Sequence, residues 1–597
     1  MNKKPIWIAG VARGHNAGVC LLKDGEIVFS IEEERLSRVK YDGGPFASIL
    51  KILEYTSKLD YIVFAHTTPL DASGTIEYTG DSIYVGFARK LGLISKDPFY
   101  GMHPQVIDLS HLHHKMHASC AFYRSGWDDA VALVVDGAGT YCPTIINEQE
   151  SITWEVESIY SCSYPATFKT LYKHLGSPNN FTTHIEPTSP SQFFDEDGTH
   201  QSVFSDRAGI VKVYEAVTRY CGFQEIDAGK TMGLFPYGKE NSNIPQLFEQ
   251  YSDVCLSNRN FIIPTYPAGA RLNNQLFPFL DTFNHDDLTL EQNRRDLAYA
   301  VQLQSQEQVV KLIRKAVALS GKNKVVISGG YGLNCVANYY YLDQLYNEGI
   351  DLYIEPISND AGTAIGAALY YWHAHTNDNT VRMHNSVYLG PSLNYSIDDV
   401  IAAAEQESVL LADATYTTIV DLLVNKHIVT IFQGRSENGP RALGNRSVLF
   451  DPRFVDGKDF VNSVKHREYF RPFAGTILEE HVHEWFDLRG MKNSPHMMYA
   501  VNCQPGVEHQ IPSIIHVDGT CRIQTVTEEQ NFHYYNLIKE FYNQTSVPVL
   551  FNTSFNLGGE PLVETLEDAI WTLQNSDIEY LYLPEFNKLI TIPNKEQ

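Results

Sequence analysis

Residues 128–140 read DDAVALVVDGAGT, a short apolar run that ends at Asp136 and a glycine-rich turn. An apolar run of this length, bounded by turn residues, predicts a buried strand. Residues 322–334, KNKVVISGGYGLN, repeat the pattern about two hundred residues later. Ligands of open α/β sheets bind beyond the carboxyl ends of the strands, where such turns lie. The repeat therefore predicts an α/β fold with two similar lobes that face one ligand cleft.

The rest of the chain supplies strands and helices around this pattern. Residues 5–11 form one apolar run, and residues 18–34 contain two alternating runs. Asp24 and Gly25 separate these two runs and predict a β-hairpin. A helix is expected over 113–123, and a long amphipathic helix over 284–321 closes a less regular insert at about 150–300. The polar stretch 375–385 looks like a linker, so we expect one domain over 1–380 and an α/β domain over 381–597.

Composition limits the classes of function. With 597 residues the chain exceeds one hydrophobic core. Its formal net charge of -25 disfavours extensive contact with a nucleic-acid backbone. Nine scattered cysteines without a CxxC pair indicate reduced thiols, and no segment approaches 18 uninterrupted apolar residues. We expect a cytoplasmic protein with no membrane partner.

A metal site is predicted from four side chains. His113 and His117 are four residues apart, so a helix would present both imidazoles on one face. Two histidines at this spacing are a weak signal by themselves. Asp136 ends one predicted strand, and Asp360, in SNDAGTAIGAA, is expected in the same cleft. Two imidazoles favour iron or zinc, whereas two carboxylates favour magnesium or manganese, so the metal stays open.

The glycine-rich turns predict a nucleotide site. Gly137 and Gly139 follow the first strand, and Gly329 and Gly330 follow the second. Neither turn ends in the Lys-Ser/Thr pair of a P-loop, but glycines allow backbone amides to approach a phosphate or a ribose. Asn334 is a candidate for bonding a ribose hydroxyl. Each turn alone could equally be a tight turn.

The C-terminal part carries a different set of polar residues. Four glycine-containing or post-strand runs hold guanidinium, ammonium, amide and hydroxyl groups: Arg441 and Arg446 in NGPRALGNRS, Lys465, Arg467 and Arg471 in KHREYFRPF, Arg522 in HVDGTCR, and Asn552, Thr553 and Ser554 in NTSFN. Arginine forks bind pairs of phosphate oxygens, and amide and hydroxyl groups bind a carbonyl or an amide. These runs predict a site for carbamoyl phosphate or a nucleotide phosphate.

Eleven motifs in a fixed order resemble one family, the NodU/CmcH-type O-carbamoyltransferases. They are GHNAG, EEERLSRVK, HHKMHA, DGAG, GKTMGLFPYG, SGGYGLN, NDAGTAIGAA, ENGPRALGNRS, FRPF, HVDGTCR and NTSFN. The resemblance implies an actin-like (ASKHA) two-lobed ATPase-type domain over 1–380 and a YrdC-like α/β domain over 381–597. The chain departs from the family's usual GHDAS at Asn16 and Gly18.

The resemblance also implies roles and cofactors. ATP, carbamoyl phosphate and a divalent metal (Fe, Zn, Mg or Mn) are the implied cofactors and co-substrate. The implied metal ligands are His113, His117, Asp136 and Asp360; the implied carbamoyl-phosphate cradle is Arg441, Arg471, Arg522, Asn552 and Ser554. His15 and Lys40 would line the site of carbamoyl transfer. Lys230 would bind the nucleotide together with the glycine-rich turns.

The acceptor of the carbamoyl group is left open by the sequence. A small molecule, a sugar, and a hydroxymethylated nucleoside, nucleotide or DNA base all offer the required hydroxyl. An actin-like ATPase or kinase without carbamoyl chemistry would explain the glycine turns, but it leaves the C-terminal arginines unused. A nucleotide-binding scaffold with a dead site conflicts with the complete metal set. The oligomeric state is also undetermined, with a homodimer as one option.

Overall fold

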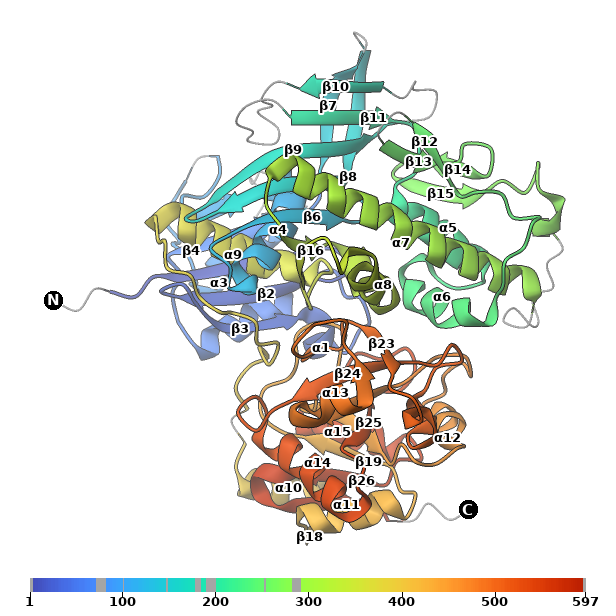
Figure 1. Ribbon diagram of the computed structural model, residues 1–597. Helices are drawn as coiled ribbons and strands as arrows, with labels where there is room; N and C mark the ends of the chain where they lie inside the picture. Colours follow the sequence, from blue (N-terminus) through green and yellow to red (C-terminus); the bar gives the residue numbers. More distant parts are fainter. Residues whose placement is uncertain are drawn as a thin grey trace. The chain divides into compact units, whose positions relative to one another are not determined.

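The chain forms two compact units (Figure 1). The computed structural model describes residues 4–70, 82–99, 101–146, 149–177, 184–188, 200–251, 254–281, 291–393 and 395–593. Unit 1 comprises Met1–Glu33 and Tyr41–Asn385, and unit 2 comprises Glu34–Lys40 and Ser386–Gln597. The expected ranges, 1–380 and 381–597, lie close to this division but did not foresee that residues 34–40 pack with the second unit.

Unit 1 begins with a sheet in the order β3-β2-β1-β4-β5. Its strands are β1 (Trp7–Ala12), β2 (Gly18–Lys23), β3 (Glu26–Glu32), β4 (Tyr61–Ala65) and β5 (Val106–Asp108). The neighbours β1-β2 and β2-β3 are antiparallel, whereas β1-β4 and β4-β5 are parallel. The predicted hairpin is present: Asp24 and Gly25 link β2 to β3 with φ of 52° and 83°, the left-handed region that such tight turns require.

A second sheet in unit 1 repeats this topology. Along its path β10-β11-β9-β8-β6-β16-β17, the pairs β6-β8 and β8-β9 are antiparallel, and β6-β16 and β16-β17 are parallel. Its strands are β6 (Asp129–Val135), β8 (Gln149–Ser163), β9 (Thr167–Gly176), β16 (Lys324–Ser328), β17 (Asp351–Ile354), β10 (His184–Thr188) and β11 (His200–Ser205), with β7 (Tyr141–Ile146) paired to β8. The predicted duplication is therefore present, and it agrees with a two-lobed actin-like domain.

The assignment of the duplicated strands was wrong, however. The two strands that end in glycine-rich turns, β6 and β16, are parallel neighbours in one sheet, with Val131 beside Val325. The counterpart of β6 in the first lobe is β1, which ends at the GHNAG turn. The insert at 150–300 was also misjudged, because it contains two long strands of the second sheet: β8 pairs with β6, and β9 pairs with β8. Both buried strands have the same apolar pattern, so the sequence could not tell neighbours from counterparts.

The two lobes exchange helices. Helix α4 (His113–Ser125) follows β5 of the first sheet but packs on β6 and β16 of the second, and α9 (Ala361–Thr376) follows β17 but packs on β1, β2 and β4. The helices also pack on each other. Their backbones come close at Gly366, where an added Cβ would lie 2.0 Å from the Met116 carbonyl oxygen. The start of each exchanged helix thus lies where the lobes meet.

Further elements complete unit 1. They are α2 (Phe46–Lys51), α3 (Ser82–Leu91), α5 (Ile210–Tyr220), α6 (Ala228–Leu234), α7 (Gln292–Ser320), α8 (Cys335–Leu345) and the paired strands β12 (Phe248–Tyr251) with β13 (Val254–Ser257) and β14 (Ile262–Thr265) with β15 (Gly269–Leu272). The predicted long helix is α7, which contacts β6, β8, β9 and β16. Residues 284–290 of that prediction lie outside the described residues.

Unit 2 is an α/β domain built on one mixed sheet, in the order β18-β27-β26-β19-β20-β25-β21-β24-β23-β22. The strands are β18 (Leu410–Asp413), β19 (Val429–Phe432), β20 (Arg446–Phe450), β21 (Ala474–Leu478), β22 (Phe486–Asp487), β23 (Ala500–Cys503), β24 (Thr520–Val526), β25 (Val549–Ser554), β26 (Tyr580–Leu583) and β27 (Lys588–Thr591). The helices are α10 (Ile397–Gln406), α11 (Tyr416–Val424), α12 (Gly457–Val464), α13 (Val482–Trp485), α14 (Phe532–Thr545) and α15 (Leu566–Gln574). The segment Glu34–Lys40, which includes most of α1 (Glu33–Ser37), belongs to this unit.

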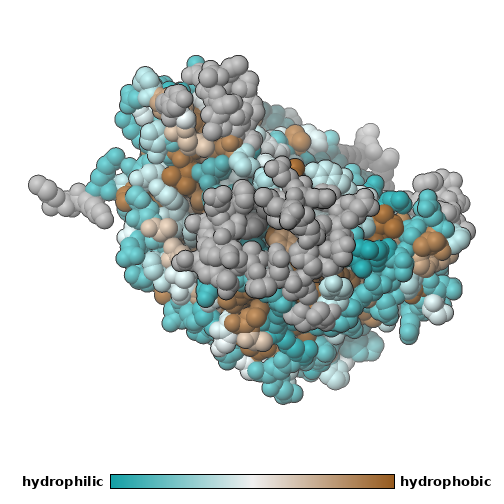
Figure 2. Space-filling view, turned by 90° about the horizontal axis from the view of Figure 1, so that it is seen from above, coloured by the Kyte–Doolittle hydropathy of each residue, from teal (hydrophilic) through white to brown (hydrophobic). Residues whose placement is uncertain are grey.

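The surface seen in Figure 2 is mostly hydrophilic, with separate small hydrophobic areas. In the part of the chain that the structure describes, every helix is too short or too polar to cross a bilayer. The cytoplasmic location stays a prediction.

Candidate metal centre and anion site

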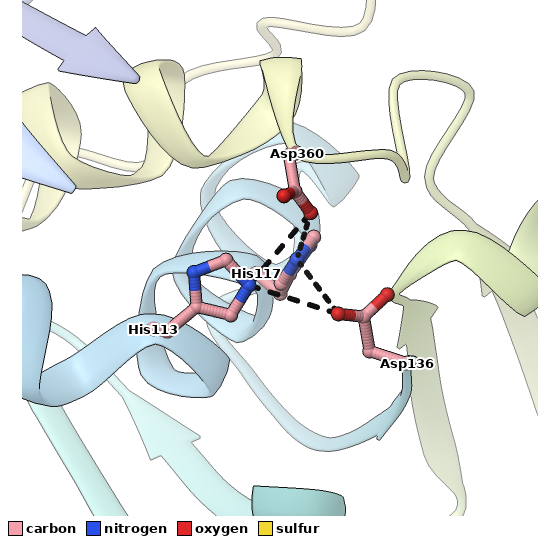
Figure 3. A group of neighbouring side chains, drawn as sticks. All are labelled: His113, His117, Asp136 and Asp360. Atoms are coloured by element: carbon pink, nitrogen blue, oxygen red, sulfur yellow. Dashed lines mark ion pairs between the residues drawn. The ribbon is translucent and has the colours of Figure 1, made fainter. Parts of the chain in front are cut away.

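The four predicted metal ligands meet in unit 1. His113 begins α4 and His117 lies one turn later, so their rings project from one face with centroids 4.8 Å apart. Asp136 follows β6, and Asp360 is the N-cap residue of α9. One ligand atom from each residue lies within 4.8 Å of all the others. Figure 3 shows the four side chains pointing toward a common centre.

The distances suit a shared cation. His113 Nε2 lies 3.7 Å from both Asp136 Oδ2 and Asp360 Oδ1. His117 Nε2 lies 3.4 Å from Asp360 Oδ1 and 3.9 Å from Asp136 Oδ2. These atom pairs are too far apart for direct hydrogen bonds, but an ion at about 2.0–2.2 Å from each atom would span them. The other oxygen of Asp136 accepts a hydrogen bond from the Gly330 amide at 2.8 Å, which orients the carboxylate.

The chemistry of the donor set also fits a metal. His113 Nδ1, His113 Nε2 and His117 Nε2 are buried and have no hydrogen-bond partner. Buried polar atoms rarely remain unsatisfied, and an ion that accepts the two Nε2 lone pairs would satisfy two of these three atoms. Burial acts to lower the pKa of His113, but Asp136 and Asp360 outweigh it and raise that pKa. The carboxylates therefore favour positive charge at this centre, whether a proton or a metal carries it.

Two more histidines lie near the cluster. His15, in the turn after β1, is 53% exposed and places Nδ1 3.9 Å from Asp360 Oδ2. His66, after β4, was missed by the sequence analysis. Its Nε2 would be 3.2 Å from a Cβ on Gly14, and its Nδ1 accepts a hydrogen bond from the Thr68 amide at 3.2 Å. Burial, then Arg13, lowers the pKa of His66 to about 4, so this ring is neutral at pH 7.

The glycine turns lie beside the cluster. Gly329 has φ of 91°, and a Cβ there would lie 2.4 Å from the Val135 carbonyl oxygen, so glycine is required. At Gly139 a Cβ would lie 2.5 Å from His114 Cδ2. Gly137 borders a pocket that is also lined by Trp154, Arg207, Gly209, Lys212 and Pro264, among others. This turn therefore connects the candidate ligand Asp136 with a pocket that carries two cationic side chains.

Two predicted nucleotide contacts have other partners. The Asn334 side chain caps α8 by accepting from the Ala337 amide at 3.0 Å, and its amide nitrogen donates to Gln302 Oε1 at 3.0 Å. This side chain is thus engaged in holding α8. Lys230, in α6, places Nζ 3.2 Å from Asp227 Oδ2.

A cluster of cations lies in unit 2. Burial, followed by Arg467 and Arg471, lowers the pKa of Lys465 well below its ordinary value. Arg467 is affected in the same way by burial, Arg471 and Arg522. Like charges gathered in a buried place are costly unless an anion compensates them. Arg471 and Arg522, which the family resemblance places in the cradle, belong to this cluster together with Lys465 and Arg467 of the KHREYFRPF run.

Strand register and loops bring the polar residues of unit 2 together. Arg522 on β24 and Asn552 on β25 both pair with Ala474 of β21, which lies between them, so their side chains share one face. Asn552 Nδ2 donates to the Ala442 carbonyl at 3.2 Å, next to Arg441 in the chain. The Lys465 ammonium donates to the backbone carbonyl of Ser554.

Arg446 is structural instead, since its guanidinium donates to backbone carbonyls that include Gln433 at 2.6 Å. The Glu34–Lys40 segment packs on the loop that carries Arg441: Arg35 Nη2 donates to the Gly439 carbonyl at 2.7 Å. Lys40 Nζ pairs with Glu34 Oε1 at 2.7 Å. Lys40 therefore belongs to unit 2, whereas His15, its predicted companion, belongs to unit 1.

Comparison with known families covers most of the chain. Residues 99–369 match the model described as the carbamoyltransferase N-terminus, and residues 420–588 match the carbamoyltransferase C-terminus. The chain belongs to the carbamoyltransferase family. It is therefore a transferase. The four residues of the candidate metal site fall in the N-terminal match, and the cation cluster falls in the C-terminal one.

Relatives of this carbamoyltransferase align over nearly the full chain. An uncharacterized protein of Synechocystis sp. is 30% identical over 98% of this chain and 96% of its own. The nodulation protein NolNO of Sinorhizobium fredii is 29% identical over 96% and 78%, respectively. The 3'-hydroxymethylcephem-O-carbamoyltransferase of Amycolatopsis lactamdurans is 26% identical over 95% and 96%. Among solved structures, full-length HypF aligns with a TM-score of only 0.35 at 12% identity, over 62% of this chain and 56% of that one. So distant a likeness carries no conclusion.

Proposed function

We propose that this carbamoyltransferase consumes ATP and carbamoyl phosphate, forms carbamoyladenylate, and transfers the carbamoyl group to a hydroxyl of an acceptor. The observation that carries the proposal is the gathering of Lys465, Arg467, Arg471 and Arg522, in which Lys465 is buried and the arginines are partly exposed. An anion bound among these like charges would compensate them. Carbamoyl phosphate is small, carries a phosphate for the guanidinium forks, and offers a carbonyl and an amide to Asn552 and the Ser554 hydroxyl.

The proposed reaction has three steps. Water releases phosphate from carbamoyl phosphate and leaves carbamate. A carbamate oxygen then attacks the α-phosphorus of ATP, so pyrophosphate leaves and carbamoyladenylate remains. Finally the acceptor hydroxyl attacks the carbamoyl carbon, its proton passes to a base, and AMP leaves. We assign the first two steps to unit 2 and the last to unit 1.

In unit 1, His113, His117, Asp136 and Asp360 would hold the divalent metal, which supplies Lewis-acid polarisation when bound. The turn residue Gly137 is proposed to offer its backbone amide to a phosphate, with Gly329 beside it. The amides of Gly139 and Gly330 already donate to the Glu155 carbonyl and to Asp136 Oδ1, so these two glycines shape the turns instead. His15 is exposed next to Asp360 and is proposed to accept the proton of the acceptor hydroxyl. The name of the cephem relative specifies a hydroxymethyl group, which supports an acceptor hydroxyl of that kind here.

The test follows the nucleotide products. Incubation with ATP and carbamoyl phosphate should release AMP and pyrophosphate, and omission of carbamoyl phosphate should stop the release. Mass spectrometry across hydroxylated small molecules, sugars and hydroxymethylated nucleosides should then find a product heavier by one carbamoyl group. Release of ADP at an equal rate without carbamoyl phosphate would instead show an ATPase or kinase of the actin-like type.

A further inference from the structure

Glu155, on β8, connects two chain segments that carry metal ligands. Its Oε2 accepts a hydrogen bond from the Thr140 amide at 3.0 Å, in the turn that begins at Asp136. The same oxygen accepts from the His114 amide at 3.3 Å, in the first turn of α4 next to His113. Amides in a first helical turn have no partner within the helix, so a carboxylate there satisfies one of them and also interacts favourably with the helix dipole.

The other oxygen of Glu155 fixes the direction of the carboxylate. Lys173 on β9 donates its ammonium to Oε1 and also bonds the Tyr160 hydroxyl at 2.9 Å. Glu155 and Lys173 are 0% and 1% exposed, respectively, so water does not compete for either charge. With Oε1 held by the ammonium, Oε2 is presented to the two backbone amides.

The surrounding backbone leaves little freedom. Gly139 donates to the Glu155 carbonyl at 2.9 Å, and Glu155 donates back to the Thr140 carbonyl at 3.2 Å. A Cβ on Gly139 would lie 2.6 Å from Glu155 Oε2. The Thr140 hydroxyl in turn accepts from the His113 amide at 3.1 Å. The turn after Asp136 and the start of α4 are thus bound to one another through Glu155 and Thr140.

We propose that Glu155, oriented by Lys173, is a positioning residue for the metal cluster. Through the two amides it sets the spacing between Asp136 and His113 before a metal arrives, so that less free energy is lost in gathering the ligands on binding. Partners behind metal ligands commonly act in this way. The inference rests on the metal site of the proposed function, but not on the carbamoyl chemistry.

The same strand offers a matched control. Glu157, two residues along β8, is also buried and pairs with a partner on β9, since its Oε2 lies 2.5 Å from His174 Nδ1. Its Oε1 accepts from the Ile210 amide at 3.0 Å, at the start of α5. Glu157 therefore resembles Glu155 in burial and pairing, but it holds a helix that carries none of the four ligands.

The experiment compares Zn²⁺ affinity of the full-length apoprotein, measured against a chromophoric chelator. In Glu155→Leu/Lys173→Met the ion pair is removed whole, which usually preserves folding, but both amides lose their acceptor. We expect Zn²⁺ to bind about 10–100-fold more weakly. Glu155→Gln/Lys173→Met differs from the leucine variant only at position 155. Its amide oxygen can accept from the Thr140 and His114 amides, so its Zn²⁺ affinity should be close to that of the wild type. Glu157→Leu/His174→Leu should bind as the wild type does.

A second comparison covers the case in which the leucine variant does not fold. In Glu155→Gln alone, the Lys173 ammonium attracts the oxygen of the new side-chain amide, so the NH₂ group of that side chain faces the backbone amides of Thr140 and His114. Zn²⁺ affinity should therefore fall. It should recover when Lys173→Met is added, because the oxygen can then turn to the two backbone amides. Equal affinity in the wild type and every position-155 variant overturns the proposal, as does loss of affinity in the Glu157 control alone. If the wild type has no Zn²⁺ site that His117→Ala removes, the metal site itself fails and this inference with it.

Discussion

His117 Nε2 lies 3.4 Å from Asp360 Oδ1, although the two residues come from helices that pack on opposite lobes. Asp360 stands at the start of α9, and His117 lies one turn into α4. Because each helix follows the last strand of one sheet and packs on the other sheet, the ligands meet where the lobes are joined. Relative motion of the lobes would therefore change the distances within the cluster.

Removal of one ligand should empty the cluster. His117→Ala or Asp360→Ala leaves three donors and uncompensated charge, so we expect loss of most bound metal together with carbamoyl transfer. Elemental analysis of the purified protein measures the metal. His373→Ala is the control, since His373 is a buried histidine of α9 that bonds the Asp378 carbonyl at 2.6 Å and lies outside the cluster. Full metal content in both ligand variants would make the histidine pair structural.

The close crossing of the exchanged helices should tolerate no side chain. In Gly366→Ala the new Cβ would lie 2.0 Å from the Met116 carbonyl, so the helices must separate. Such overpacking costs about 1–3 kcal/mol, and the midpoint of thermal unfolding should fall. Gly229→Ala in α6 meets nothing within 4 Å and should raise the midpoint, because alanine favours helices by about 1 kcal/mol over glycine. Equal effects of the two variants would contradict this account of the crossing.

Substitutions in the two units should block different steps of the proposed reaction. Arg522→Lys removes a guanidinium fork from the cation cluster, and lysine cannot reproduce its geometry. Carbamoyl-phosphate-dependent pyrophosphate release should therefore stop. His15→Ala should keep that release and lose carbamoylated product by about 10²–10⁴-fold, the usual contribution of a general base. Pyrophosphate assays and mass spectrometry of the same reactions separate the outcomes. The assignment is wrong if His15→Ala stops pyrophosphate release or Arg522→Lys spares it.

Anion binding at the cation cluster should take up a proton. Burial, Arg467 and Arg471 lower the pKa of Lys465 from its ordinary 10.5. Between the lowered value and 10.5 the unfolded chain holds more protons than the folded one, so this residue makes stability rise with pH across that window. A bound dianion favours the ammonium and raises the pKa again.

Sulfate, which does not titrate in this range, is a suitable probe for that uptake. Calorimetric titrations in two buffers with different ionisation enthalpies measure the protons bound per sulfate, and the number should be positive within the window. Lys465→Met should abolish the uptake while the arginines still bind the anion. An uptake that persists in Lys465→Met would place the titrating group elsewhere.

Much of the candidate site could be predicted from short patterns. The i, i+4 histidines, the strand that ends at Asp136 and the strand-turn-helix around Asp360 each carry a local signal, and the structure joins them. Glu155 carried no such signal. In the run Trp154-Glu155-Val156-Glu157 the alternation is typical of a strand with one polar, solvent-facing side, yet both glutamates are buried because β9 supplies Lys173 and His174. The pattern within one strand does not show which side chains a neighbouring strand will bring against it.

The sequence alone therefore determined the local elements that carry the candidate ligands, because helix spacing, strand alternation and turn residues depend on neighbours in the chain. Only the tertiary structure decided which strands pair. It placed β6 beside β16, exchanged α4 and α9 between the sheets, and gave Glu34–Lys40 to unit 2. The physical reason is that backbone hydrogen bonds between strands and the burial of ion pairs depend on residues far apart in the sequence, and equally apolar strands offer many pairings that only the packed whole can distinguish.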